Sequence, residues 1–358
     1  MLKKLAGLIG LLLLGAIAYL LLAPVPIEPK AWTPPVSPGY TGEFALNDRL
    51  RGIERLAEGR GHGPEGVSLD AQGRVYAGYS DGRIVRLDPA SGELTELANT
   101  GGHPLGTAVG PAGELYVADA AKGLLQIEEG QVRVLSTSAN DVPFRFVDDV
   151  DVSADGGQLY FTDASARFGF DELMADVMEH GGTGRLLRYD RASGVTTVLL
   201  DGLFFPNGVA LGPDDSYLLV TETAQYRVRR YWLKGEKAGT SDVLIENLPG
   251  FPDNLSFNGS DRFWLALYAP RPAELDQLLP RPWLRKIVLR LPAALHPKPV
   301  MHAAVLGLDF DGKVVANLQD ASEGAYAPIT SVEQAGDTLY FGSLSYPAFG
   351  RLRLDPTR

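Results

Sequence analysis

The chain contains no cysteine among its 358 residues, which excludes disulfides, thiolate nucleophiles, cysteine-ligated zinc and a lipoprotein anchor. Positive charge is also scarce, since 33 Lys and Arg residues face 44 Asp and Glu residues and the net charge is −11. A surface of that sign repels phosphate backbones, so nucleic acid is not expected as a partner. The rest of the composition, 45% hydrophobic and 22% charged, is that of a globular protein with a large core.

One long uncharged run extends from Leu5 to Ala23. As a helix it spans about 28 Å, close to the roughly 30 Å hydrocarbon thickness of a bilayer. A cleaved signal peptide is the alternative, but its apolar core is usually about 7–15 residues long and ends in a small-residue cleavage site. Here the run is longer and Leu21 occupies a small-residue position. We therefore predict an uncleaved transmembrane anchor over residues 5–23.

The charges next to this run predict its orientation. Lys3 and Lys4 precede it, so the positive-inside rule predicts a cytoplasmic tail at residues 1–4. The protein is then a single-pass membrane protein whose remaining residues lie on the extracytoplasmic side, periplasmic or lumenal. Residues 24–50 begin with six prolines between Pro24 and Pro38. They predict a stiff Pro-rich linker that holds the next domain off the bilayer.

Residues 51–358 repeat one phrase six times, in which a small motif is followed by a turn and an alternating strand. The phrases start 40, 43, 59, 46 and 76 residues apart, at Pro64, Pro104, Val147, Pro206, Pro252 and Pro328. A unit of about 40–50 residues with period-two alternation is typical of a propeller blade. The sequence thus predicts an all-β fold, a six-bladed β-propeller preceded by one N-terminal transmembrane helix, with insertions at 164–184 and 269–301. A β-sandwich or β-solenoid is the alternative, but a solenoid has shorter, more regular periods and a sandwich does not repeat one phrase.

Both insertions have helical spacing. Residues 170–180 predict a short helix that ends at His180 and leans over the channel mouth. Residues 283–291 predict a basic amphipathic helix, which either packs as a cap on the blades or acts as a lid that also touches anionic lipid. Either arrangement narrows the entrance and favours small hydrophobic substrates.

The repeat also predicts a metal site. The first strand of each propeller blade lines the central channel, so the second residue of every phrase belongs to one ring. These residues are Glu65, Leu105, Asp148, Asn207, Asp253 and Ile329, with Asn254 next to the fifth. Carboxylates about 4 Å apart repel by roughly 4 kcal/mol at an effective dielectric of 20, and a cation removes that conflict.

Hard oxygen ligands favour Ca²⁺, with magnesium next. The alternative is that each Asp or Asn only caps a turn through its own backbone. We predict one calcium ion in the channel, and Asp149 beside Asp148 allows a second, structural ion. The predicted metal ligands are Glu65, Asp148, Asn207, Asp253 and Asn254.

Several phrases resemble a known family. They are Phe205-Pro-Asn-Gly-Val, Pro64-Glu-Gly-Val, Phe251-Pro-Asp-Asn-Leu and Gly184-Arg-Leu-Leu-Arg-Tyr-Asp. They are similar to the strictosidine synthase-like and adipocyte plasma membrane-associated protein branch of the six-bladed calcium-dependent propellers, whose relatives include gluconolactonase and paraoxonase. The resemblance runs from about Gly61 to the carboxyl terminus.

What the resemblance implies is a channel calcium held by Glu65, Asp148, Asn207 and Asp253. It also implies a calcium-dependent hydrolase of lactones or aryl esters, in which the metal polarises the ester oxygen and a base activates water.

Two departures bear on that activity. The glutamate slot of strictosidine synthase falls at about Ala327, which disfavours a synthase-type condensing enzyme, although Glu323 is close by. The histidine of paraoxonase falls at Leu105. The remaining candidates for the base are His180 and His103, or else a metal-bound carboxylate, Asp253 or Asp148, acting as base or nucleophile. A non-catalytic, membrane-tethered binding propeller is the other alternative.

Overall fold

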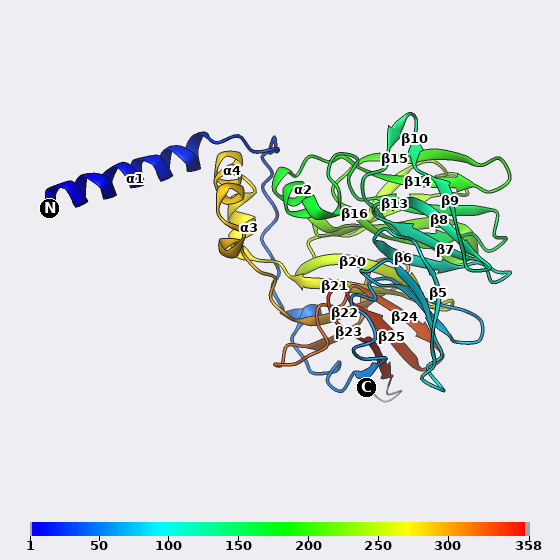
Figure 1. Cartoon of the computed structure of the whole chain (residues 1–358). Coiled ribbons are helices and arrows are strands. Elements are labelled where there is room, and N and C mark those ends of the chain that lie inside the picture. The colour runs from blue at the N-terminus through cyan, green and yellow to red at the C-terminus, as the bar shows by residue number, and fades with distance from the viewer. Residues whose placement is uncertain (1, 355–358) are drawn as a thin grey trace.

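Six four-stranded antiparallel sheets surround a central axis and form a six-bladed β-propeller, with one helix extending away from it (Figure 1). The computed structural model describes residues 2–354 of the chain. The predicted fold class is therefore confirmed. The first residue of the predicted cytoplasmic tail and residues 355–358 of the predicted propeller lie outside the described residues.

Blades 1 to 3 each use four consecutive strands of the chain, from the channel outward. Blade 1 contains β2 (Val67–Leu69), β3 (Val75–Gly78), β4 (Arg83–Leu87) and β5 (Leu94–Asn99). Blade 2 contains β6 (Pro104–Val109), β7 (Leu115–Asp119), β8 (Gly123–Glu128) and β9 (Gln131–Ser136). A small hairpin follows, β10 (Ser138–Ala139) and β11 (Val142–Pro143). Blade 3 contains β12 (Val147–Val152), β13 (Gln158–Asp163), β14 (Gly184–Asp190) and β15 (Val195–Leu203).

Blades 4 and 5 follow the same plan, and blade 6 begins with it. Blade 4 contains β16 (Pro206–Leu211), β17 (Tyr217–Glu222), β18 (Arg227–Trp232) and β19 (Ser241–Ile245), with the 3-10 turns η3 (Pro213–Asp215) and η4 (Thr223–Gln225). Blade 5 contains β20 (Gly250–Phe257), β21 (Phe263–Pro270), β22 (Ala303–Leu308) and β23 (Val314–Asp320). Blade 6 begins with β24 (Ser331–Ala335), β25 (Thr338–Gly342) and β26 (Phe349–Arg353).

The innermost strands are the repeated phrases. Each of β2, β6, β12, β16, β20 and β24 contacts the next around the axis, and β24 contacts β2. Between blades the core is apolar; for example, Tyr160 and Leu186 of blade 3 pack with Val209 and Leu218 of blade 4. Because alternate residues of each strand point into these interfaces, the period-two pattern of the sequence predicted them.

The ring is closed by the N-terminal segment of the chain. Strand β1 (Glu54–Leu56) pairs with β26, with Glu54 opposite Arg351 and Leu56 opposite Phe349, and so supplies the fourth strand of blade 6. Leu50 and Ile53, just before it, are buried where blades 5 and 6 meet. The sequence repeat did not reveal this closure, because β1 is three residues long and precedes the first phrase.

The N-terminal helix α1 (Leu2–Leu22) is long and apolar enough to cross a membrane and is unburied throughout. The linker after it contacts the propeller, which the sequence did not predict, and its role as a spacer from the bilayer stays a prediction. It lies on the propeller, since the Lys30 amide donates to the Glu179 carbonyl (3.0 Å) and the Trp32 amide to the Leu279 carbonyl (3.2 Å). Ile27 is 1% exposed, and the turn η1 (Gly42–Phe44) buries Phe44 against blades 4 and 5.

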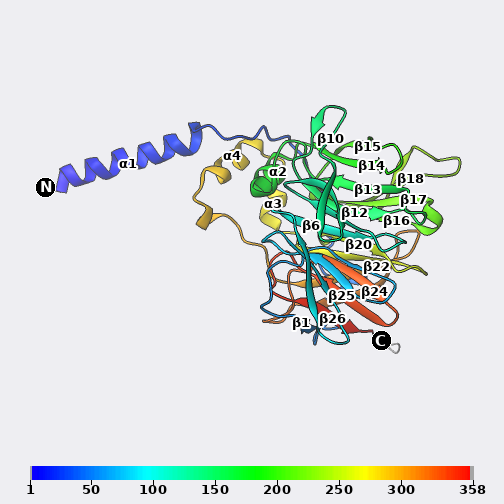
Figure 2. The same cartoon turned by 45° about the vertical axis from the view of Figure 1, so that its right-hand side comes forward.

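Both insertions contain the helices that their spacing predicted. The first holds η2 (Phe170–Glu172) and α2 (Leu173–Glu179), and the second holds α3 (Ala273–Leu278), α4 (Pro282–Arg290) and η5 (Ala293–Leu295). Helix α2 contacts α4, and both lie on the side of the propeller from which α1 departs (Figures 1 and 2). The insertions therefore cover one end of the channel.

Candidate functional site

The candidate ligands lie at the covered end of the channel. In blade 3, Val147 at the start of the inner strand pairs with Asp163, after which the first insertion begins. In blade 5, Gly250 pairs with Pro270, after which the second insertion begins. The inner strands thus start where the insertions start, and the second residue of each phrase lies at that end.

Four inner strands are bulged at this level. The register shifts between Val147 and Val150 and between Pro252 and Leu255, and similar shifts occur in β6 and β16. A bulge re-aims a side chain and breaks the strict alternation of a strand. Two successive residues in a bulge can therefore point toward the same region of the channel, which applies to Asp253 and Asn254.

Glycine allows the strands to approach one another. A Cβ atom on Gly66 would lie 2.7 Å from the Cα of Gly106, and one on Gly208 would lie 2.6 Å from the Cα of Asn254. Both glycines directly follow a predicted ligand. A larger residue would force neighbouring blades apart and widen the ring.

The predicted ligands are all buried. Their exposed fractions range from 2% to 6%, for Asp148, Glu65, Asp253, Asn254 and Asn207. The side-chain amide of Asn254 donates to Glu65 Oε1 at 2.8 Å, which joins blade 5 to blade 1. The ring positions without oxygen donors, Leu105 and Ile329, are buried apolar residues.

The carboxylates of the ring disfavour one another's ionisation. Burial and the Asp149 carboxylate raise the pKa of Glu65 to about 8. Burial, followed by the carboxylates of Glu65 and Asp149, raises the pKa of Asp148 well above its usual range. Burial, then Glu65 and Asp148, does the same to the pKa of Asp253. Such a cluster has to take up protons or bind a cation.

Three buried oxygens of the ring have no hydrogen-bond partner in the described part of the chain, namely Glu65 Oε2, Asn207 Oδ1 and Asn254 Oδ1. Buried acceptors are normally paired, so three orphans in one place need a donor or a metal. Within residues 2–354, no three His, Asp or Glu side chains are grouped closely enough to hold an ion by themselves. A donor set at this place would need the amide oxygens of Asn207 and Asn254 as well, and carboxylate plus amide oxygens suit calcium.

A layer of hydroxyl groups fixes the ligand backbones. Thr330 Oγ1 and Ser331 Oγ donate to the Glu65 carbonyl at 2.8 and 2.7 Å. Thr162 Oγ1 donates to the Asn207 carbonyl, and Thr221 Oγ1 accepts from the Gly208 amide. These residues were not predicted from the sequence. The signal was present, because Thr162 and Thr221 each precede an acid at the end of a second strand.

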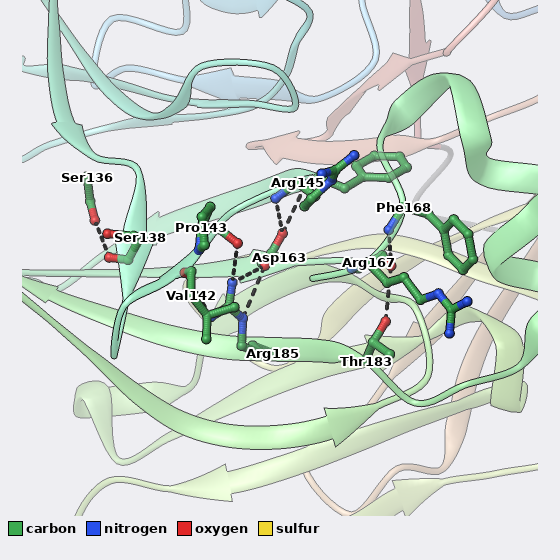
Figure 3. Close-up of polar contacts among 12 residues, drawn as sticks. Ser136, Ser138, Val142, Pro143, Arg145, Asp163, Arg167, Phe168, Thr183 and Arg185 are labelled. Atoms are coloured by element: carbon green, nitrogen blue, oxygen red, sulfur yellow. Dashed lines mark hydrogen bonds and ion pairs between the residues drawn. The ribbon is translucent and has the colours of Figure 1, made fainter. Parts of the chain in front are cut away.

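That acid has a structural role, which Figure 3 shows for Asp163. Asp163 Oδ2 accepts from Arg185 Nε at 3.1 Å, while Oδ1 accepts from the amides of Arg145 and Phe146. Arg185 also donates to the carbonyl of Pro143 (3.1 Å). Asp163 therefore has its own cation and anchors the loop that leads into β12, unlike the ring carboxylates.

Aromatic side chains cover the mouth of the channel. The ring of Phe146 lies 5.3 Å from that of Phe205 and 5.5 Å from that of Phe170, with edge-on geometry, and Leu105 belongs to the same cluster. His103 stacks on Phe170 at 3.9 Å, and burial lowers its pKa. The site is thus roofed by apolar groups, with His103 at the margin of the roof.

His180 lies in an aromatic sandwich. Its ring is stacked on Trp32 at 4.6 Å and lies 4.5 Å from Phe204, and its Nε2 is 3.1 Å from Gln225 Nε2. Burial, followed by Arg285, lowers its pKa to about 3, so the ring is neutral. None of these contacts is with one of the predicted metal ligands. The role of His180 as a base remains a prediction.

The two other predicted positions lie apart from the ring. Ala327 is buried within blade 6, whereas Glu323 is exposed to solvent. A shifted loop therefore does not carry Glu323 into the channel here.

Below the ring of predicted metal ligands, toward the other end of the channel, a cavity of about 390 Å³ is lined by Asp149, Asp151 and Glu333. The second calcium ion remains a prediction.

Fold and site together define a six-bladed propeller with a buried, oxygen-rich site at the end of its channel that helical insertions cover. The chain matches the strictosidine synthase family over residues 148–236 and the strictosidine synthase-like N-terminal family over residues 42–87. It is 34% identical to adipocyte plasma membrane-associated protein of Bos taurus, covering 98% of this chain and 89% of that protein. It is 38% identical to strictosidine synthase-like protein 10 of Arabidopsis thaliana, covering 80% and 84%. The chain therefore belongs to the strictosidine synthase-like family, as the resemblance indicated.

Solved structures share the fold. A gluconolactonase of Xanthomonas campestris is 17% identical, with a TM-score of 0.62 over 92% of this chain and 99% of that one. Regucalcin of Agrobacterium tumefaciens, described as a calcium-binding protein, is 16% identical, with a TM-score of 0.56 over 85% and 94%. At such identities these likenesses show the fold alone.

Proposed function

We propose that this protein is a membrane-anchored, calcium-dependent hydrolase of small hydrophobic lactones or aryl esters. The observation that carries the proposal is the set of three buried, unpartnered oxygens on Glu65, Asn207 and Asn254, beside carboxylates that face one another without a cation. The gluconolactonase fold supports it at the level of architecture.

Glu65, Asp148, Asn207, Asp253 and Asn254 are the residues that would hold the ion. Calcium bound there supplies Lewis-acid polarisation of an ester or lactone carbonyl. The Asn254 amide keeps the Glu65 carboxylate turned toward blade 5. The roof of Phe146, Phe170 and Phe205 receives an apolar acyl or aryl group and excludes bulk water.

The proton acceptor that fits best is the Asp148 carboxylate. It accepts no hydrogen bond from any described residue, so its oxygens are available to accept a proton from water. Asp253 is the second candidate, although its Oδ1 accepts from the Asn254 amide at 3.1 Å. Both histidine candidates are engaged with aromatic rings.

We also propose that α1 spans the membrane once, with the propeller on the extracytoplasmic side. The apolar helix and the name of the Bos taurus relative support membrane association. The orientation rests on Lys3 and Lys4 at the N-terminal end of the helix.

Purified full-length protein in detergent tests the activity. We expect hydrolysis of phenyl acetate or a medium-chain lactone that a chelator abolishes and calcium restores. Asn207→Ala and Asp253→Ala should each lower kcat/KM by about 10²–10³, as loss of one electrostatic stabiliser commonly does. Asp261→Ala, at an exposed turn, is the control and should keep full activity.

A non-catalytic binding propeller is the second candidate, and the sequestered rings of His103 and His180 favour it. Calcium binding without turnover of any ester or lactone would select this alternative. Turnover of an amine with an aldehyde would instead indicate a condensing enzyme and contradict the hydrolase.

A further inference from the structure

The end of the membrane helix is bonded to the propeller's second insertion. Arg290 of α4 donates through Nε to the Ala23 carbonyl (2.6 Å) and through Nη1 to the Leu20 carbonyl (2.8 Å). The last carbonyls of a helix lack partners within it, and a cation there is favoured by the helix dipole. Helix α4 therefore lies where α1 ends.

The linker keeps α4 at that place. Arg285 is completely buried, and its guanidinium donates to the carbonyls of Met178 in α2 and Lys30 in the linker. Ile27 packs with Phe168 and Met178. Linker and both insertions thus pack together, and they place α4 beside the end of α1.

The second insertion is positively charged, whereas the whole chain is negatively charged. Residues 277–308 contain no Asp or Glu and five Lys or Arg residues, in a chain of net charge −11. Arg285 and Arg290 are used in the contacts above. Arg281, Lys286 and Lys298 remain, with no ion pair to any described residue.

The same segment exposes large apolar side chains. Trp283 is 61% exposed, Leu295 65%, Val300 62% and Met301 53%. Basic residues interspersed with a tryptophan and aliphatic residues are typical of segments that lie in a membrane interface. Figures 1 and 2 show α3 and α4 between α1 and the blades, on the side of the propeller from which α1 extends.

We propose that residues 281–301 form a membrane-contact segment that binds an anionic phospholipid surface. Docking of this segment lays the covered end of the channel against the bilayer. Lys286 and Lys298 meet lipid phosphates while Trp283 and Leu295 enter the headgroup region. The inference concerns how the propeller sits on the membrane, and it holds whether or not the channel site hydrolyses esters.

The chain's lack of cysteine makes the test direct. Full-length Leu295→Cys carries a single environment-sensitive fluorophore and is reconstituted in phosphatidylglycerol–phosphatidylcholine vesicles containing lipids with a nitroxide near the top of the acyl chain. The matched control is Val195→Cys, 55% exposed on the outer strand β15. We expect quenching at position 295 about twofold or more above the control, because interfacial apolar groups lie roughly 5–10 Å deep.

A second arm tests the charge. In the double variant Lys286→Glu/Lys298→Glu, quenching at position 295 should fall to the control level while the melting temperature is unchanged. Equal quenching at 295 and 195 in the parent would overturn the proposal. A label that is shielded from water but not quenched by the nitroxide lipids would also overturn it, because it would indicate a protein partner. Quenching that survives the double substitution would overturn it as well.

Discussion

The two carboxyl oxygens of Glu65 have different surroundings. Oε1 accepts a hydrogen bond from Asn254, whereas Oε2 has no hydrogen-bond partner among the described residues. Its raised pKa shows that the negative charge is uncompensated by any protein cation. At the scale of single residues, the ring is therefore destabilising until a cation binds. Replacing a ring carboxylate by an amide removes its charge but keeps the size of the side chain, so that the effect of the charge can be measured alone.

Glu65→Gln retains an oxygen that can accept from Asn254 but removes one charge. We expect calcium affinity to fall by about 10- to 100-fold, the usual range for removal of an important group near a metal. Without calcium the variant should melt at a higher temperature than the parent, because less charge is buried. Calorimetric titration and thermal unfolding check both results. Glu58→Gln, at an exposed site, should change neither.

His180 predicts a pH dependence of stability. Its folded pKa is about 3, whereas the unfolded chain takes up a proton near pH 6.5. The stabilisation is complete above pH 6.5 and is lost as the pH falls toward 3, since only the unfolded state gains the proton. Between pH 7 and pH 5 this group should lower the free energy of unfolding by about 2 kcal/mol.

His180→Phe keeps an aromatic ring between Trp32 and Phe204. In this variant the contribution of about 2 kcal/mol to the fall in the free energy of unfolding between pH 7 and pH 5 should disappear. Because His180 has a φ of 52°, His180→Asn is the second variant, since asparagine tolerates this backbone. Denaturant unfolding at the two pH values measures the effect. A slope identical in parent and variants would show that His180 takes up its proton equally in the folded and unfolded chains, which would contradict the lowered pKa.

Single residues of the ring could be predicted because each occupies the same place in a repeated phrase. The bulges could not, since a bulge at Asp148 or Asp253 depends on the partner strand rather than on the local pattern. The surroundings of His180 were equally out of reach. Its aromatic partner Trp32 comes from a linker far away along the chain.

At the scale of elements, the docking of the proline-rich linker on the propeller was not predicted. Its partners are distant in sequence: Arg285, which binds the Lys30 carbonyl, lies 255 positions away, and Glu179, which accepts from the Glu28 amide, lies 151 positions away. The insertion helices were predictable because helical spacing is local. Contacts between these elements depend on the finished propeller.

Arg285→Ala should release the linker. The variant leaves the carbonyls of Met178 and Lys30 without their donor, which costs about 1–3 kcal/mol per unsatisfied buried group. We expect a lower melting temperature and faster tryptic cleavage after Lys30. Arg281→Ala, at the exposed N-cap of the same helix, is the matched control. Equal protection of the linker in both variants would mean that Arg285 does not hold it.

At the scale of the whole molecule, the propeller depends on residues that precede its first repeat. Removal of residues 1–23 leaves β1 in place and should preserve cooperative unfolding. Removal of residues 1–57 deletes β1 together with the buried side chains of Phe44, Leu50 and Ile53. Each such side chain contributes about 1.5–3 kcal/mol, so this second truncation should lose most of a typical domain's stability.

Circular dichroism melting of the two truncated chains in the same detergent checks this expectation. Equal melting temperatures would show that β26 closes the ring without β1. The six-blade architecture itself was predictable from the repeat, whereas its point of closure was not, because three residues carry no periodicity.

That point of closure determines when the fold can be completed. Glu54 and Arg351, which form an ion pair across β1 and β26, are 297 positions apart. Strand β1 therefore has no partner in blade 6 until β26 has been synthesised. The circle of blades can therefore be sealed only after every strand between β1 and β26 has been made.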